Sequence, residues 1–210
     1  MIRILLALLL VAIPLTGAAQ SDAPVRRPEI RVGDSWTYRS TNVLEAGTYE
    51  HETRVSYADD KAILAVSTRK SDGKEFDSSW TSEWNATVSY TGLHYRPPTG
   101  VLQFPLRVGD KHSIKFEVLE PRGRNLLFRA SGTSTVVGWE MVEVPAGKFR
   151  ALRVVLEAVY EQVAGPGPTS FQQEAIFWYV PDVRRWVKLQ SVAGQRRLSE
   201  ELLTFKLNED

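Results

Sequence analysis

Residues 49–57 read Tyr-Glu-His-Glu-Thr-Arg-Val-Ser-Tyr, and this stretch indicates the fold more clearly than any other part of the chain. Side chains alternate between the two faces of a β-strand, so every second residue from Tyr49 to Tyr57 would share one face. The charged residues and Ser56 would occupy the other. One face with aromatic and apolar side chains and one solvent-exposed face are typical of an antiparallel strand that covers a core.

The same alternation recurs between His112 and Val118 and again between Leu203 and Leu207. Further strands are expected over residues 35–42, 61–69, 84–91, 125–131, 134–144, 149–162, 171–180 and 184–192, with Gly, Pro and Asp-rich turns between them. Residues 78–84 and 196–203 hint at helix, although the second stretch also suits a charged edge strand. The pattern therefore predicts an all-β protein with an antiparallel, strongly curved sheet or open barrel and little helix.

The composition excludes several classes of protein. The chain has 210 residues and no cysteine, which excludes a disulfide scaffold, a thiolate zinc site, an iron–sulfur cluster and a cysteine nucleophile. Its 26 basic and 25 acidic residues nearly cancel, so charge gives no reason to expect nucleic acid as a partner. No cofactor is implied.

The first residues predict export. Arg3 precedes an apolar run from Ile4 to Leu15, and small residues follow up to Ala19. This run of about 12 residues is too short to cross about 30 Å of hydrocarbon, so residues 1–19 are interpreted as a signal peptide. A short anchor or a buried helix is the alternative. We expect a soluble mature protein without a transmembrane segment, in a bacterial periplasm or secreted. A bacterial origin is expected because exported eukaryotic proteins usually carry disulfides and this chain has no cysteine.

The remainder is interpreted as an extended leader over residues 20–30 and a single β domain over residues 31–210. Within that domain, Arg-Val-Gly-Asp occurs at residues 31–34 and again at 107–110, each time before an expected strand. Two duplicated β units, 31–106 and 107–207, would explain the echo. The alternative is that two strands begin with the same tight turn.

Motifs for catalysis are missing from the sequence. The three histidines lack the spacing of metal ligands, and no G-x-S-x-G elbow or Walker loop occurs. The carboxylates Asp59 and Asp60 precede Lys61 between two expected strands, where a solvated turn is the natural interpretation. No catalytic residue and no metal site is therefore assigned, and an enzymatic role stays open but disfavoured.

Tryptophan is the distinctive residue, with six in the chain. Trp80 and Trp84 would point the same way on a helix or on a strand face. Trp178 and Trp186 flank Pro181 and would come from two paired strands. We predict these four as a ligand-binding surface, and a core built from large rings is the alternative.

Two longer signatures resemble a family. Residues 144–154 have the form V-P-A-G-x-F-x-A-x-x-V, and residues 178–188 have the form W-Y-x-P-x-V-x-x-x-V-K. With V-G-D-x-W-x-Y at residues 32–38, they resemble a group of uncharacterised exported bacterial β proteins that share a domain of unknown function. The resemblance is close over residues 144–188 and looser from 32 to 207. It implies export and a curved antiparallel sheet, and it implies no activity.

Three hypotheses follow for the function. The first is a non-catalytic periplasmic protein that binds an apolar or amphipathic ligand, such as a lipid, or an envelope partner on a concave aromatic face. The second is a structural or assembly factor of the cell envelope without a small ligand. The third is a glycan-acting envelope hydrolase, which would need two carboxyl groups about 5–10 Å apart beside the rings.

Overall fold

A computed structural model describes residues 23–42, 47–163 and 169–209. Within them the backbone forms twelve strands and one short 3₁₀ helix, η1. The strands are β1 (Ser35–Asn42), β2 (Gly47–Ala58), β3 (Ala62–Arg69), β4 (Glu75–Thr81), β5 (Ala86–Val88), β6 (His94–Arg96), β7 (Lys111–Leu119), β8 (Leu126–Val144), β9 (Gly147–Gln162), β10 (Ser170–Val180), β11 (Arg185–Ala193) and β12 (Arg196–Lys206), and η1 spans Pro181–Val183.

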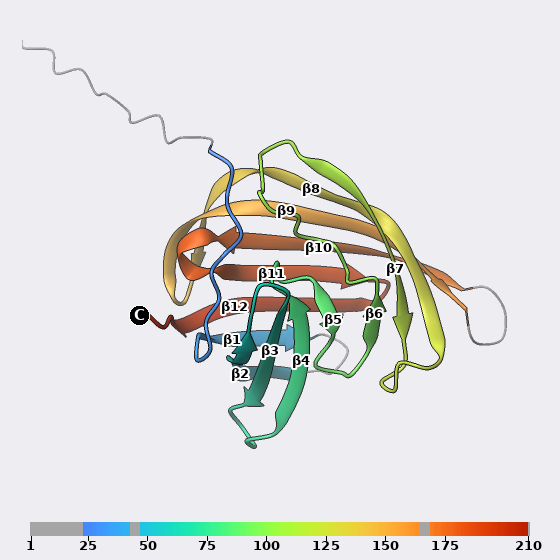
Figure 1. The fold of residues 1–210 in the computed structure, drawn as a ribbon, viewed down its shortest axis with the longest axis horizontal. Coiled ribbons are helices and arrows are strands. Elements are labelled where there is room, and N and C mark those ends of the chain that lie inside the picture. The colour runs from blue at the N-terminus through green and yellow to red at the C-terminus, as the bar shows by residue number, and fades with distance from the viewer. Residues whose placement is uncertain (1–22, 43–46, 164–168, 210) are drawn as a thin grey trace, which may run out of the picture.

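All neighbouring strands are antiparallel, and each pairs with the next one along the chain (Figure 1). β1 also pairs with β12, from Ser35 opposite Lys206 to Asn42 opposite Leu198, so the sheet closes into a barrel. The all-β antiparallel prediction is confirmed. The sheet is closed rather than open because β1 has a hydrogen-bonded partner along both of its sides, which removes the exposed edges.

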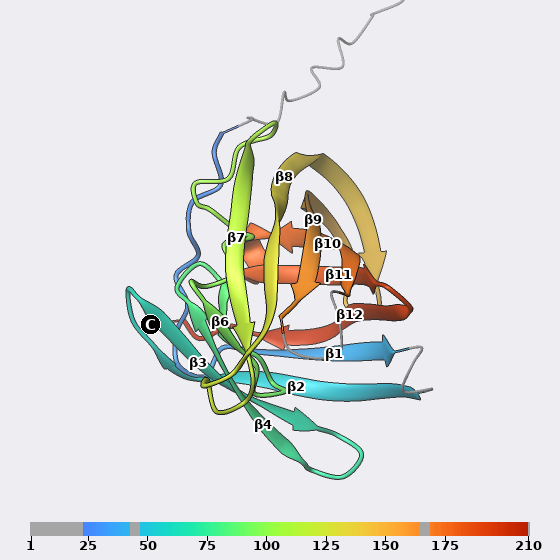
Figure 2. The same ribbon diagram turned by 90° about the vertical axis from the view of Figure 1, so that its right-hand side faces the viewer.

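The weakest part of the barrel wall lies between the short strands β5 and β6. Val88 opposite His94 is the single residue pair that joins them in the described chain. By contrast, the long strands β8 and β9 curve strongly (Figure 2) and form sixteen residue pairs. Gly132 takes part in this ladder, so the expected break between residues 131 and 134 is absent, and β8 continues through it.

The helix suggested for residues 78–84 is wrong. Residues up to Thr81 belong to β4, where Trp80 pairs with Ile63 of β3. Trp84 then adopts a left-handed backbone conformation, with φ of 62°, in the turn before β5. Residues 196–203 lie in β12, which confirms a strand for that stretch, but the edge position is wrong because β12 pairs with both β1 and β11.

The two Arg-Val-Gly-Asp turns have the same geometry. Gly33 and Gly109 have φ of 88° and 90°. Each glycine N–H donates to the carbonyl of a valine in the second strand that follows, Val55 at 2.9 Å and Val136 at 2.8 Å. The turns open β1–β6, called here the first half, and β7–β12, the second half. Common descent of these halves stays a prediction.

A second correspondence between the halves lies after their fourth strands. Trp84 follows β4 and Arg184 follows β10, and both are left-handed, with φ of 62° and 60°. The Trp84 N–H donates to the Thr81 carbonyl at 3.0 Å, and the Arg184 N–H donates to the Pro181 carbonyl at 2.9 Å. The halves therefore share two backbone devices.

The predicted signal peptide, residues 1–19, lies outside the described residues, as do residues 20–22 of the expected leader. The described part of that leader is not independent of the barrel. Val25 pairs with Leu106 in an antiparallel bridge and is buried in the core. Across the described ranges, no helix is both long and apolar enough to span a membrane.

Candidate functional site

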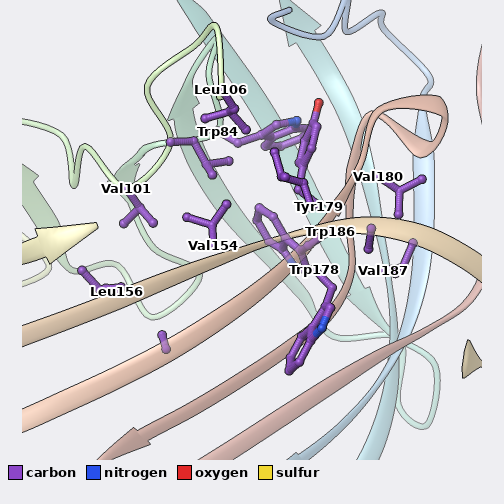
Figure 3. Close-up of a cluster of buried hydrophobic side chains, with 14 of the residues drawn as sticks. Trp84, Val101, Leu106, Val154, Leu156, Trp178, Tyr179, Val180, Trp186 and Val187 are labelled. Atoms are coloured by element: carbon purple, nitrogen blue, oxygen red, sulfur yellow. The ribbon is translucent and has the colours of Figure 1, made fainter. Parts of the chain in front are cut away.

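Tryptophan rings gather inside the barrel. Trp84 contacts Trp36, Trp80 and Trp186, with ring centroids 5.4, 5.8 and 6.1 Å apart. Trp84 and Trp186 are only 2% and 3% exposed, and Figure 3 shows them within the buried cluster. The prediction that Trp80 and Trp84 point the same way agrees with this geometry. We call Trp36, Trp80, Trp84 and Trp186 the indole cluster.

Arg185 lies in the middle of the indole cluster and is 5% exposed. Its guanidinium carbon is 4.4 Å from the ring centroid of Trp186 and 4.5 Å from that of Trp84. The Nε and Nη1 atoms are buried and have no hydrogen-bond partner in the described chain. Burial lowers the pKa of Arg185, and the surrounding rings offer their negative π faces to the cation instead of a carboxylate.

Trp178, the fourth predicted site residue, lies apart from the indole cluster. Its Nε1 donates to Glu140, and Lys188 Nζ lies 5.8 Å from its ring centroid. The neighbouring Tyr179 is buried, as Trp178 is, and packs against Phe104, with ring centroids 5.5 Å apart. The structure therefore brings Trp80, Trp84 and Trp186 together and leaves Trp178 outside their ring contacts.

Beyond the indole cluster, the inward-facing side of β1 carries polar groups that contact His51 and Glu200. The Tyr38 hydroxyl donates to the Trp186 carbonyl at 2.6 Å, and its ring stacks on His51, with centroids 5.8 Å apart. Ser40 Oγ lies 3.4 Å from His51 Nδ1 and donates to Glu200 Oε1 at 3.2 Å. Because alternate residues of β1 share a face, Trp36, Tyr38 and Ser40 form one column from the cluster to this polar group.

A cavity of about 430 Å³ lies at the polar end of that column. Its lining residues are Gly47, Thr48, Tyr49, His51, Ser67, Arg69, Ser71, Phe76, Tyr90, Thr91 and Glu200. We call it the mouth cavity. Three aromatic rings and one carboxylate belong to this lining, so the cavity combines apolar walls with a few polar groups.

Arg69 is the cation of the mouth cavity. Its guanidinium carbon lies 5.6 Å from the ring centroid of Tyr49 and 5.4 Å from that of Phe76. Its Nη1 makes a long contact of 3.4 Å with Asp72, and its Nε is buried without a partner in the part of the chain that the structure describes. The Arg69 guanidinium is therefore held by rings and retains donor capacity.

His51 is a titratable group in the lining of the mouth cavity. Burial lowers its pKa, and the positive charge of Arg185 lowers it further, while Glu200 opposes both effects. The imidazole is therefore neutral at pH 7. The described residues hold no group of three or more His, Asp or Glu side chains that could bind a metal ion.

The mouth cavity was not predicted as a site from the sequence. The alternation along residues 49–57 places Tyr49 and His51 on the inner face, and this was the one sequence feature that could have pointed to the cavity. Glu200 comes from a stretch with an ambiguous helix or strand pattern. Arg69 and Phe76 become neighbours only when β3 and β4 pair, with Ser67 opposite Phe76.

Comparison with known proteins gives likeness at the level of fold. No family model matches the chain, and no curated protein matches it significantly. Among solved structures, a candidate lipoprotein from Parabacteroides distasonis is similar, with a TM-score of 0.53 and 12% identity over 88% of this chain and 100% of that one. A candidate exported protein with a YmcC-like fold from Bacteroides fragilis has a TM-score of 0.50 and 16% identity over the same shares. At these identities the likeness shows that the chain shares their β fold.

Proposed function

We propose that this chain is an exported protein of the bacterial cell envelope that binds an amphipathic small molecule in the mouth cavity and does not transform it. The observation that carries the proposal is the cavity itself. Its volume of about 430 Å³ falls within the range of small-molecule sites, and its lining pairs aromatic walls with convergent polar groups.

Two observations support the export part of this proposal. The sequence pattern of residues 1–19 is that of a signal peptide. The two similar structures are described as a candidate lipoprotein and a candidate exported protein, and each is covered over its whole length. The absence of cysteine fits an exported protein of a bacterium, because exported eukaryotic proteins usually carry disulfides.

The burial of the indole cluster supports placing the ligand in the mouth cavity rather than on the tryptophans. Trp84 and Trp186 are covered by other side chains, so a ligand could reach them only if the core opened. The rings that line the mouth cavity are Tyr49, Phe76 and Tyr90. The four predicted tryptophans do not belong to the lining of the mouth cavity, and direct ligand contact by them stays a prediction.

The polar lining favours binding over glycoside hydrolysis. Hydrolysis of a glycosidic bond generally uses two carboxyl groups about 5–10 Å apart. Among the described residues, Glu200 is the single carboxylate in the lining of the mouth cavity. The cavity can therefore hold polar groups of a ligand, but the part of its lining that the structure describes does not supply the second carboxyl group of that mechanism.

The test is binding of dodecyl maltoside, a neutral amphiphile, to the mature chain, residues 20–210, by isothermal titration calorimetry. Native mass spectrometry of the purified protein would show any copurifying ligand. We expect Tyr90→Ser to weaken dodecyl maltoside binding about fivefold, because about 1 kcal/mol of ring contact is lost. Tyr57→Ser is the matched control, since Tyr57 and Tyr90 are both 47% exposed and Tyr57 is absent from the lining.

Binding that Tyr90→Ser leaves unchanged would move the site away from the mouth cavity. Absence of any bound amphiphile in both experiments would contradict the proposed function. A single envelope protein recovered by crosslinking, without a small ligand, would favour the assembly factor instead.

A further inference from the structure

We propose that the mouth cavity selects an amphiphile with an anionic head group, a carboxylate or a phosphate, and that Arg69 binds this group. The inference rests on the proposed function and specifies its ligand. The observation behind it is a guanidinium placed between two aromatic rings with a buried, unpartnered Nε among the described residues.

Arg69 has the geometry of an anion receptor. A guanidinium presents its N–H groups as a planar fork that matches carboxylate and phosphate oxygens. The Tyr49 and Phe76 rings on either side restrict the side chain, so less conformational freedom is lost when an anion binds. The contact from Nη1 to Asp72 is 3.4 Å long and half exposed, so it competes weakly.

The charges around the mouth cavity favour an anion. Lys74 Nζ lies 5.1 Å from the ring centroid of Phe76, which lines the cavity. Arg185 carries its charge beneath the floor, and no ion pair within 4.0 Å offsets that charge in the described part of the chain. Glu200 is the opposing charge, and His51 is neutral because burial lowers its pKa. Among the described residues near the cavity, the cations Arg69, Lys74 and Arg185 therefore outnumber the carboxylates Glu200 and Asp72, which leaves a net positive charge.

The aromatic walls determine the other part of the ligand. Tyr49, Phe76 and Tyr90 line the same cavity as Arg69, and the Phe76 and Tyr90 centroids are 6.4 Å apart. An apolar chain attached to the anion would cover these rings, whereas a free anion would leave them hydrated. The chemistry of the cavity thus fits an alkyl carboxylate or alkyl phosphate better than an inorganic anion.

The experiment is calorimetric titration of the mature chain at pH 7.5 with dodecanoate, dodecyl phosphate, dodecyl maltoside, dodecyltrimethylammonium and inorganic phosphate. All organic probes are used below their critical micelle concentrations. We expect the two anionic amphiphiles to bind at least tenfold more tightly than dodecyl maltoside. Dodecyltrimethylammonium should bind more weakly than the neutral probe, and inorganic phosphate should not bind measurably.

Variants of opposite expected sign keep the inference testable even if one does not fold. Arg69→Gln should reduce the affinity for dodecyl phosphate at least tenfold, so that the variant no longer prefers dodecyl phosphate to dodecyl maltoside. Glu200→Gln should raise the affinity for dodecyl phosphate several-fold, because a like charge is removed. Arg39→Gln is the control, since Arg39 forms an exposed ion pair with Glu50 outside the cavity lining.

Equal affinity for the neutral and anionic probes would overturn this inference and leave the proposed function standing. Tight binding of inorganic phosphate alone would overturn the requirement for an apolar chain. If none of the probes binds, both proposals are wrong. An Arg69→Gln variant that binds dodecyl phosphate like the unaltered chain would overturn the role of Arg69.

Discussion

Asp34 connects three segments that lie far apart in the sequence. Its Oδ2 accepts hydrogen bonds from the Arg31 N–H at 3.0 Å and from Arg184 Nη1 at 3.1 Å, and its Oδ1 accepts one from the Asn208 N–H at 2.7 Å. The carboxylate is fully buried, so each of these partners replaces water that was removed on folding. One side chain thereby joins the start of β1, the turn before β11 and the C-terminal segment.

We predict that Asp34→Asn lowers the free energy of unfolding by about 2–4 kcal/mol. The variant removes the partner of Arg184 and leaves one acceptor where a buried carboxylate had two. Asp110→Asn is the matched control, because Asp110 occupies the same position of the second Arg-Val-Gly-Asp turn and is exposed. Its effect should stay within about 0.5 kcal/mol in urea unfolding. Equal losses in the two variants would show that the turn, rather than the buried contacts, matters.

His51 predicts how stability depends on pH. Its pKa in the folded protein lies below the ordinary value of about 6.5, because burial and Arg185 disfavour the imidazolium more than Glu200 favours it. Below pH 6.5 the unfolded chain therefore binds a proton that the folded protein does not. The stabilisation is complete above pH 6.5 and decreases as the pH falls toward the folded pKa.

The measurement is urea unfolding of the unaltered chain and of His51→Gln at intervals from pH 7.5 to 5. We expect a shallower decrease for His51→Gln. Glu52 and Asp59 have lowered pKa values and contribute mainly below this interval, where their carboxylates protonate. The charged groups that face His51 are Arg69, Arg185 and Glu200. Parallel pH profiles would contradict the prediction.

At the scale of elements, period-two alternation was sufficient for the strands with one buried face. β1 spans Ser35–Asn42, as expected, and its buried residues alternate up to Asn42. The Trp80–Trp84 spacing was not sufficient, because residues four apart face the same way on a helix and on a strand, and Trp84 lies in the turn after β4. Pairing of Trp80 with Ile63 across β3 and β4 decides for the strand, and that contact is tertiary.

The candidate site was predictable only in part for the same reason. Aromatic content indicated that rings would gather, and Trp80, Trp84 and Trp186 do so. The mouth cavity depends instead on which strand ends meet, since Arg69 comes from β3 and Glu200 from β12. No local pattern connects these two residues, which only barrel closure brings to one end.

Gly132 shows how closely β8 approaches β9. A Cβ at this position would lie 2.6 Å from Ala158 Cα and would overlap the Glu157 carbonyl oxygen, both of them backbone atoms that cannot rotate away. We predict that Gly132→Ala destabilises the protein by at least about 2 kcal/mol, because the β8–β9 ladder must shift. The measurement is the urea midpoint.

Gly73→Ala is the control for this prediction. Gly73 has φ of 70°, and the methyl group of an alanine there would meet nothing within 4 Å, so the variant carries backbone strain without overlap. We expect a loss of about 1–2 kcal/mol from that strain. A Gly132→Ala loss no larger than this would mean that the two strands separate easily, contrary to their close packing.

At the scale of the whole molecule, the two halves are joined through the indole cluster. Trp36 Nε1 donates to the Val183 carbonyl at 2.9 Å, and Trp84 Nε1 donates to the Arg184 carbonyl at 2.8 Å. The Tyr38 hydroxyl donates to the Trp186 carbonyl. Every one of these donors belongs to the first half and every acceptor to the second. The halves therefore share a core even though each begins with its own Arg-Val-Gly-Asp turn.

This shared core predicts one cooperative unfolding transition for the mature chain. Far-UV circular dichroism reports strands of both halves, and tryptophan fluorescence reports mainly the indole cluster, so the two urea curves should coincide. Trp84→Phe removes the donor to the Arg184 carbonyl and should shift both curves equally, by about 1–3 kcal/mol. Trp139→Phe, a half-buried ring outside the indole cluster, is the control. Hydrogen exchange of the two halves in urea tests this directly. If β9 and β10 stayed protected at a urea concentration where β1–β3 had exchanged, the halves would unfold separately. The buried hydrogen bonds between the halves would then not couple them.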